Sequence, residues 1–206
     1  MRAGIPSLLL ITDSRRYSDD HLFTVLDRVL GKGVDAILLR EKELSSAKLL
    51  ALAAKLRELT TARGAALYIH TQADIASAVN ADGVHVASGD IMNIPAIRSW
   101  LNDADKTVSA SCHTKQELGL AEQYGADFVF LSPVFPTQSH PGAASLGVDQ
   151  FNSLSSQTPL PVIALGGIDS DNCTAFKEHG IAVISAILGA EDPGMAVNQL
   201  SKSGSQ

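Results

Sequence analysis

The chain has 206 residues, a length that suits one domain of ordinary size. Hydrophobic residues make up 45% and charged residues 18%, a balance that supports a sizeable core and excludes general disorder. The net charge of −6 excludes a basic nucleic-acid footprint, and an aromatic content of 5% argues against a base-stacking surface. Local donors, not the overall field of the protein, must therefore hold any anionic ligand.

The cysteines and the first apolar run indicate in which cellular compartment the protein is expected. Cys112 and Cys173 are far apart and form no C-x-x-C motif, so neither a disulfide scaffold nor a structural zinc site is indicated. The run Ser7–Thr12 is too short for a membrane span or a signal-peptide core. We expect a cytoplasmic protein with neither a membrane nor a nucleic acid as its partner.

A repeated pattern organises the chain, in which a short aliphatic or β-branched run is followed by a segment of helical character. The expected strands are Ser7–Thr12, Ala36–Arg40, Ala66–His70, Gly83–Val86, Thr107–Ser111, Phe128–Leu131, Pro161–Leu165 and Ala182–Ser185. The expected helices are Asp20–Leu30, Ser45–Ala62, Ala73–Val79, Pro95–Leu101, Lys115–Tyr124, Val148–Ser155, Asp171–His179 and Gly194–Lys202. Several strand runs are almost continuously apolar, which is typical of parallel strands covered by helices on both faces.

Eight such β-then-α units favour a closed (β/α)8 TIM barrel, a single α/β domain over residues 1–200 with a flexible tail over 201–206. The alternative is an open doubly wound sheet, which the absence of G-x-G-x-x-G after the first strand disfavours in its dinucleotide-binding form. Helix-start signals occur at Ser45, at Asp169–Asn172 and at Thr114-x-x-Glu117, which predicts a capping box.

In a barrel of this type, reactive groups gather where the strands end. Gly166-Gly167 after the seventh strand and Ser185-Ala186 after the eighth match the phosphate site that such barrels often build from their last two loops. A tight turn at the two glycines is the alternative. Arg40 and Lys42 follow the apolar second strand and are suited to gripping a phosphate; the alternative is a solvated cluster in which Glu41 neutralises one cation.

The long segment Ser132–Gly147 contains hydroxyl and imidazole groups at Thr137, Ser139 and His140. Loops of this size are usually lids or binding loops, and a proline-stiffened surface loop is the alternative. His85 is expected to be a hydrogen-bonded core histidine.

The segment after the fifth strand offers two further reactive side chains. His113 is interpreted either as a base or as a residue of the helix cap. Cys112 beside it has no neighbour that would guarantee a lowered thiol pKa, so a nucleophilic role is not indicated.

Seven motifs occur in one order over nearly the whole chain. They are Leu38-Leu39-Arg40-Glu41-Lys42, Ala81-Asp82-Gly83-Val84-His85, Ser111-Cys112-His113-Thr114, Gly125-Ala126-Asp127-Phe128-Val129, Ser132-Pro133-Val134-Phe135-Pro136-Thr137, Ala164-Leu165-Gly166-Gly167-Ile168 and Ile184-Ser185-Ala186-Ile187. As a set they resemble the thiamine phosphate synthase/TenI family. The resemblance implies a (β/α)8 barrel that joins hydroxymethylpyrimidine pyrophosphate to thiazole phosphate, releases pyrophosphate and uses Mg²⁺.

The resemblance also implies roles for individual residues. Arg40 and Lys42 fall on the pyrophosphate grip, and Ser111 falls on a pyrophosphate and substrate contact. Asp90 falls on a Mg²⁺ carboxylate. The thiazole-phosphate contacts fall on Thr137, Gly167, Ser185 and Ala186.

Five positions depart from the family pattern. Leu39 stands where synthases carry Gln, His70-Thr71 where they carry Asn-Asp, and His140 where they carry Lys. Pro133 stands where the TenI branch, similar to a thiazole tautomerase, carries His. The motifs Ser139–Ala143 and Ser111–His113 look closest to the synthase-like domain fused to some Nudix hydrolases.

Three functions therefore stay open at this point. They are the coupling reaction, thiazole isomerisation with His113 or His140 as the base, and a non-catalytic barrel that binds phosphorylated ligands or regulates. The expected partners are phosphorylated thiazole and pyrimidine compounds. The oligomeric state is left open.

Overall fold

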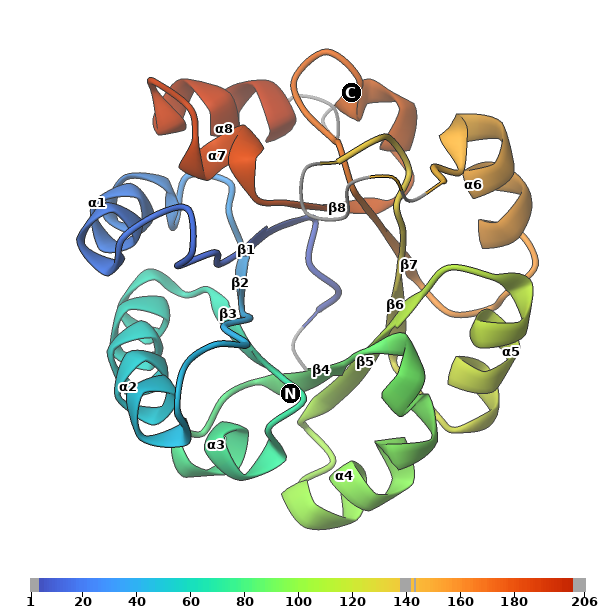
Figure 1. Ribbon diagram of the computed structural model, residues 1–206, viewed down its shortest axis with the longest axis horizontal. Helices are drawn as coiled ribbons and strands as arrows, with labels where there is room; N and C mark the ends of the chain where they lie inside the picture. The colour runs from blue at the N-terminus through green and yellow to red at the C-terminus, as the bar shows by residue number, and fades with distance from the viewer. Residues whose placement is uncertain (1–3, 138–141, 143, 202–206) are drawn as a thin grey trace.

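The computed structural model describes residues 4–137, 142 and 144–201, and it shows eight parallel strands closed into a barrel (Figure 1). The strands are β1 Leu8–Ile11, β2 Ala36–Leu39, β3 Ala66–His70, β4 Gly83–Val86, β5 Thr107–Cys112, β6 Phe128–Leu131, β7 Val162–Leu165 and β8 Gly180–Val183. Each strand pairs with its neighbour in the chain, and β8 closes on β1 with Leu9 opposite Ala182. The predicted (β/α)8 barrel is confirmed, and the alternative of an open sheet is wrong.

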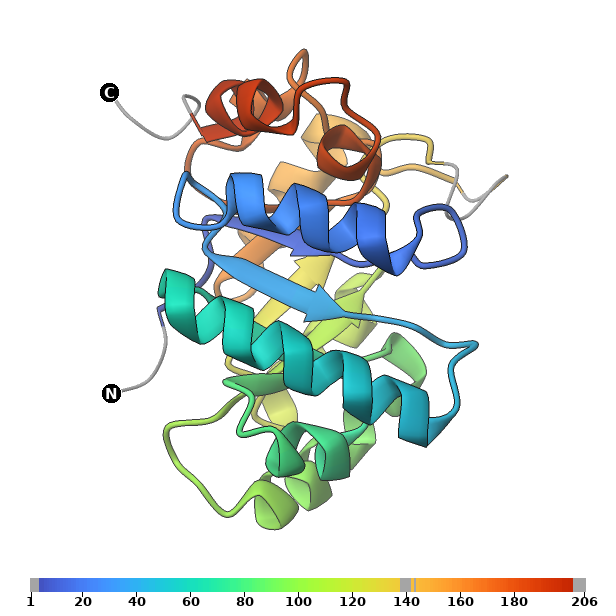
Figure 2. The same ribbon diagram turned by 90° about the vertical axis from the view of Figure 1, so that its left-hand side faces the viewer.

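Helices form an outer layer around the ring of strands (Figures 1 and 2). They are α1 Asp19–Val29, α2 Ser46–Arg63, α3 Ala73–Ala78, α4 Ile94–Leu101, α5 Lys115–Gln123, α6 Gly147–Ser155, α7 Ser185–Leu188 and α8 Pro193–Ser201. Two 3₁₀ turns, η1 Ser88–Asn93 and η2 Cys173–Phe176, complete the connections. Within the described residues, no helix is both long enough and apolar enough to cross a membrane.

Local sequence signals explain several helix ends. The predicted capping box is confirmed, because the Thr114 hydroxyl accepts from the Glu117 amide while the Glu117 carboxylate accepts from the Thr114 amide. Ser45 is the N-cap of α2, although its side chain makes no capping hydrogen bond. Asn172, the last residue of the predicted start signal Asp169–Asn172, precedes η2, and its side-chain oxygen accepts from the Asp169 amide.

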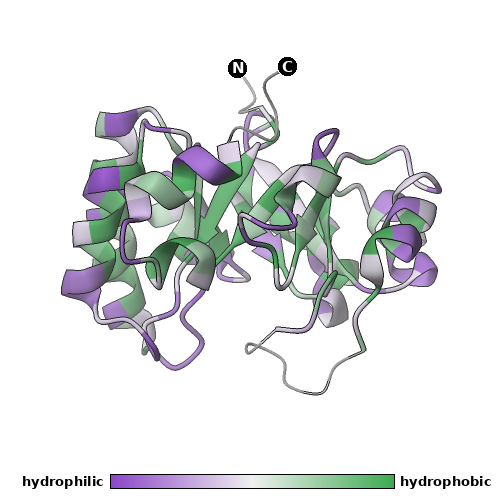
Figure 3. Ribbon diagram, turned by 90° about the horizontal axis from the view of Figure 1, so that it is seen from above, coloured by the Kyte–Doolittle hydropathy of each residue, from purple (hydrophilic) through white to green (hydrophobic). Residues whose placement is uncertain are grey.

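The core has two parts, which explains the unbroken apolar strands. Inside the barrel lies one buried cluster, made of Leu9, Ile11, Ala36, Leu38, Tyr68, Phe128, Phe130, Ile163 and Ala182. A larger cluster fills the space between the strands and the helices, where alternate strand residues such as Leu8, Ile37 and Val129 point outward. Figure 3 shows the strands as a hydrophobic centre and the polar residues on the outer faces of the helices. Both strand faces are therefore buried.

The last two units differ from the predicted boundaries. β8 begins at Gly180, two residues before the predicted start, and a Cβ at that position would come within 2.3 Å of the Pro6 carbonyl oxygen. The glycine there serves a close backbone approach inside a strand and does not mark a turn. The helix expected over Asp171–His179 is only the short turn η2, and Ser185 begins α7 instead of ending a strand. Ser201 ends α8, and the rest of the expected tail lies outside the described residues.

Candidate active site

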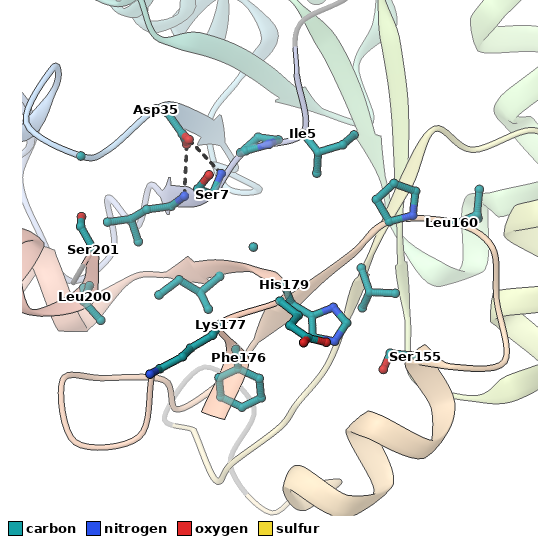
Figure 4. A pocket seen from close by; sticks show the side chains of 18 residues that line it. Ile5, Ser7, Asp35, Ser155, Leu160, Phe176, Lys177, His179, Leu200 and Ser201 are labelled. Atoms are coloured by element: carbon teal, nitrogen blue, oxygen red, sulfur yellow. Dashed lines mark hydrogen bonds between the residues drawn. The ribbon is translucent and has the colours of Figure 1, made fainter. Parts of the chain in front are cut away.

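The strand ends of β2, β3 and β4 surround a hollow of about 290 Å³ at the C-terminal mouth of the barrel. It is lined by Leu39, Glu41, Lys42, Leu49, His70, Thr71, Gln72, Ala87 and Asp90. The fold therefore brings the predicted residues Lys42 and Asp90 to one cavity. A larger hollow of about 790 Å³ lies at the opposite end (Figure 4), and none of the predicted site residues lines it.

Arg40 is the half-buried cation of the mouth. Its backbone amide donates to the Thr12 hydroxyl across the β1–β2 pair, at 3.0 Å. Burial lowers the pKa of Arg40, and the nearby positive charge of Arg15 lowers it further. A second cation beside a partly buried guanidinium is unfavourable on its own and is relieved by a bound anion. Sequence reasoning missed Arg15, although an arginine pair directly after the first strand was a usable signal.

The negative charge of Glu41 favours the charged form of Arg40, but its carboxylate makes its hydrogen bonds to another residue. It is buried, and both of its carboxylate oxygens accept from the Ser14 backbone amide, at 3.1 and 3.0 Å. The Ser14 hydroxyl donates to the same carboxylate. Glu41 thus fixes the loop between β1 and α1, while its charge and that of Asp13 also act favourably on Arg40.

His70 and Thr71 form a strained, under-bonded part of the mouth. The His70 Nδ1 atom is buried and has no hydrogen-bond partner within the described part of the chain. Burial, assisted by Arg40 and Lys42, lowers the pKa of His70 to about 4, so its ring is neutral at pH 7. Thr71 has φ 58°, which is a genuine outlier for a β-branched residue. Strain of this kind is often found at functional sites.

His85 is a buried core histidine, as predicted. Its Nδ1 and Nε2 atoms each lie 2.8 Å from a serine hydroxyl, that of Ser109 and that of Ser111 respectively. Its ring packs at 4.2 Å from the Phe130 ring, centroid to centroid, and lies 6.1 Å from the ring of His70. Burial lowers the pKa of His85 well below its ordinary value, so the ring is neutral.

The structure connects His113 to the neighbouring strand end. Its Nδ1 atom donates to the Ser132 carbonyl at 2.6 Å, and its backbone amide donates to the Glu117 carboxylate of the capping box. The ring is thus anchored beside the cap with Nδ1 engaged. Burial raises the pKa of the adjacent Cys112 thiol to about 12, which fits the expectation that this cysteine is no nucleophile.

The glycine pair after β7 makes a close backbone approach to the loop after β6. Gly166 and Gly167 have φ of 103° and 65°, values that side chains disfavour. A Cβ on Gly166 would lie 2.9 Å from Pro133, and one on Gly167 would lie 2.6 Å from the Pro136 carbonyl oxygen. The Phe135 amide also donates to the Gly166 carbonyl at 2.9 Å. The pair therefore lets two loops pack closely, a structural task different from the tight turn given as the alternative.

Open amides remain beside this packed pair. β7 and β8 are hydrogen-bonded neighbours, so the loops that follow them are adjacent. The backbone amides of Gly167, Ser185 and Ala186 donate to no acceptor within the described ranges, and the last two open the short helix α7. Free N–H groups of this kind suit an anion.

The remaining predicted residues are unevenly placed. Asp90 lies in η1 and faces the mouth hollow with Lys42 and Thr71. Thr137 is partly buried in the loop after β6, whereas Ser139 and His140 lie outside the described residues. The described residues contain no group of three His, Cys, Asp or Glu side chains suited to hold a metal.

Fold and mouth together define a single-domain (β/α)8 barrel whose cations and open amides gather at the C-terminal ends of the strands. The family model described as thiamine monophosphate synthase matches residues 8–189, and the chain belongs to this family.

Relatives support the same assignment. The chain is 36% identical over 198 residues to a thiamine-phosphate synthase of Desulfitobacterium hafniense, covering 94% of this chain and 95% of that protein. It is 36% identical over 186 residues to that of Methanococcus maripaludis, covering 89% and 87%. Among solved structures, thiamine phosphate pyrophosphorylase from Pyrococcus furiosus superimposes with a TM-score of 0.84 at 32% identity, covering 96% of this chain and 95% of that one.

Proposed function

We propose that this chain is a thiamine-phosphate synthase that joins hydroxymethylpyrimidine pyrophosphate to thiazole phosphate and releases pyrophosphate. The observation that carries the proposal is the presence of two separate sets of anion donors on one mouth, in a member of this family. Arg40 and Lys42 follow β2, and the amides of Gly167, Ser185 and Ala186 follow β7 and β8. One set suits a pyrophosphate and the other a monophosphate.

The reaction needs little covalent chemistry from the protein. The lone pair of the thiazole nitrogen forms a bond to the pyrimidine methylene carbon, while the bond from that carbon to the pyrophosphate oxygen breaks. The bonding electrons leave with pyrophosphate, so negative charge grows at the oxygen near Arg40 and Lys42. Fixed donors aimed at developing charge are a main source of catalysis, and we assign this role to the two cations and to Ser111.

His113 is assigned a positioning role. Its hydrogen bond to the Ser132 carbonyl ties the end of β5 to the loop that carries Thr137. Thr137 in turn is assigned to the monophosphate side of the mouth. We place Ser139 and His140, from the same loop, as further contacts on that side.

A divalent cation fits the mouth only when it is shared with the substrate. Asp90 offers a carboxylate at the hollow, whereas the Glu41 oxygens are taken by Ser14. Mg²⁺ is commonly held by one or two carboxylates together with phosphate oxygens. Asp90 is therefore the residue we propose to hold Mg²⁺ on the pyrophosphate, where the ion would neutralise charge on the leaving group.

The test is a reaction with both purified precursors and Mg²⁺, in which thiamine phosphate and pyrophosphate are measured together. We expect equal amounts of the two products, and a loss of about 100-fold in rate for Lys42→Ala. Lys55→Ala, which removes the same charge from the exposed side of α2, should leave the rate unchanged. Isomerised thiazole phosphate without thiamine phosphate, or binding without any turnover, would overturn the proposal.

A further inference from the structure

Three polar side chains form a hydrogen-bonded relay, Ser109–His85–Ser111, inside the otherwise apolar barrel. Ser109 is fully buried on β5 and lies 2.8 Å from Nδ1 of His85. Nε2 of His85 lies 2.8 Å from the hydroxyl of Ser111, which is partly exposed two residues further along β5. This relay of hydrogen bonds therefore runs from the buried interior of the barrel to the mouth.

The direction of the hydrogen bonds along this chain follows from a count of donors. Because the ring of His85 is neutral, it carries one N–H group and one acceptor nitrogen. If Nδ1 carried the proton, Ser109 would have to accept, and its own O–H would have no acceptor within the described part of the chain. A buried donor without a partner is costly, so this arrangement is disfavoured. Donation by Ser109 to Nδ1 satisfies both groups.

We infer that Ser109 and His85 are positioning residues that make Ser111 a hydrogen-bond donor toward the mouth. Ser109 donates to Nδ1, the proton of His85 resides on Nε2, and Nε2–H donates to the Ser111 oxygen. The Ser111 hydroxyl proton is then free to point at an acceptor in the mouth.

This direction assigns Ser111 to an anionic ligand. In the opposite direction Ser111 would donate into the ring and would have only lone pairs to offer at the mouth, which an anion repels. The same reasoning excludes His85 as a base that activates Ser111, because a base needs a bare Nε2 facing the hydroxyl. That the anion is pyrophosphate rests on the proposed function, whereas the proton positions do not.

The proton positions are measured by ¹⁵N NMR of ligand-free protein labelled at histidine, since protonated and bare ring nitrogens have well-separated shifts. The chain has six histidines, and the signals of His85 are identified as those that disappear in His85→Gln. We expect a protonated Nε2 and a bare Nδ1. The reverse pattern would overturn the inference, whatever the activity of the protein.

The role of Ser109 is measured with Ser109→Ala and a matched variant, Thr107→Val. Thr107 is a buried hydroxyl residue at the start of the same strand, opposite Gly83, and its hydroxyl donates to the Asp82 carbonyl and not to His85. In Ser109→Ala we expect a population with Nδ1 protonated, and inorganic pyrophosphate with Mg²⁺ binding about 10-fold more weakly by calorimetry. In Thr107→Val both should match the wild type, even if the melting temperature falls.

The possible outcomes test this inference independently of the proposed function. If Ser109→Ala folds and keeps the wild-type ring protonation and pyrophosphate affinity, Ser109 is not a positioning residue. If that variant does not fold, the wild-type NMR pattern still decides the direction of the hydrogen bonds between Ser109, His85 and Ser111. Absence of synthase activity combined with a protonated Nε2 would overturn the proposed function and leave this inference standing.

Discussion

The two ends of the barrel use the same eight strands in opposite ways. At the N-terminal end, an aspartate precedes each of β2, β4 and β6 and accepts a backbone amide of the preceding strand region. Asp35 accepts from Ser7 and Leu8, Asp82 accepts from Leu67, and Asp127 accepts from Val108. Figure 4 shows the bonds of Asp35 beside the larger hollow.

Two of these aspartates also bind an arginine from an outer helix. Arg57 of α2 pairs with Asp82, and Arg98 of α4 pairs with Asp127, both at 2.5 Å. The carboxylates of this end are thus engaged by donors from the protein itself. Asp82 and Asp127 belong to the motifs that carry the family resemblance, yet they lie at the end opposite the candidate site.

At the mouth, by contrast, donors and cations remain available. The amides after β7 and β8 are open within the described residues, and Arg40 lies near Arg15. Internally satisfied polar groups stabilise a fold, whereas groups left open at the C-terminal strand ends await a ligand. Variants at the two ends should therefore separate stability from function.

The largest expected effect is that of Arg40→Ala at the mouth. We expect kcat/KM to fall about 1000-fold, equivalent to about 4 kcal/mol, because a cation next to the leaving group is lost. The melting temperature should change little. Arg28→Ala, on the exposed side of α1, is the matched control and should retain full activity.

Calorimetry sharpens this result. Arg40→Ala should weaken binding of pyrophosphate much more than binding of a monophosphate, since the open amides lie on the other side of the mouth. Equal losses of affinity for the two ligands would contradict separate binding regions for pyrophosphate and monophosphate.

Asp127→Ala should have the opposite signature at the other end. The Val108 amide would lose its acceptor and Arg98 its ion pair, although Arg98 keeps the Gly125 carbonyl, so we expect the free energy of unfolding to fall by about 3 kcal/mol. Activity per folded molecule should be unchanged. Urea denaturation measures the loss, with the exposed Glu43→Ala as control. A loss of kcat in the fully folded variant would show that the two ends are coupled.

The neutral His70 predicts a pH effect on stability. Its pKa is about 4 in the folded protein and near 6.5 when unfolded, so below pH 6.5 the unfolded chain binds a proton that the folded chain does not. The contribution of His70 to the free energy of unfolding is fully present above pH 6.5. It falls as the pH drops toward 4, and about 2 kcal/mol is lost at pH 5. Urea denaturation at pH 8 and pH 5 should show a smaller drop for His70→Gln. Identical drops in both proteins would refute the assignment.

Gly167→Ala should damage the monophosphate side of the mouth. A Cβ would meet the Pro136 carbonyl at 2.6 Å in a left-handed backbone, so the loop after β6 must move, at a cost of about 1.5 kcal/mol. We expect about 10-fold weaker binding of thiazole phosphate by calorimetry. Gly89→Ala, where a Cβ meets nothing within 4 Å, should bind normally. Normal binding by Gly167→Ala as well would exclude this loop from the site.

The smallest expected effect is a gain at Thr71. Aspartate and asparagine tolerate a positive φ better than threonine, so Thr71→Asp and Thr71→Asn should each add about 0.5–1 kcal/mol of stability. Only Thr71→Asp places a second carboxylate at the hollow with Asp90 and should lower the Mg²⁺ concentration needed for activity about 5-fold. An equal Mg²⁺ requirement in the two variants would remove Thr71 as a position that limits metal binding.

The sequence alone determined the architecture and most of the positions at the mouth. Apolar runs such as Ala36–Leu39, which alternate with segments of helical periodicity, specify parallel strands buried on both faces. The pattern of apolar residues in each element shows which of its faces are buried. Boundaries failed in the last two units, as at Gly180, whose close approach to the Pro6 carbonyl is a long-range contact that no local pattern records.

Only the tertiary structure decided which polar groups are satisfied. Glu41 is engaged by Ser14 and His85 by Ser109, partners that lie 27 and 24 residues apart in the chain. Likewise, the proximity of Arg15 to Arg40 and the strain at Thr71 arise from loops that the closed barrel brings together. Local patterns indicate which residues reach the strand ends, whereas hydrogen bonding and charge there depend on contacts between strands and loops that the local pattern does not record.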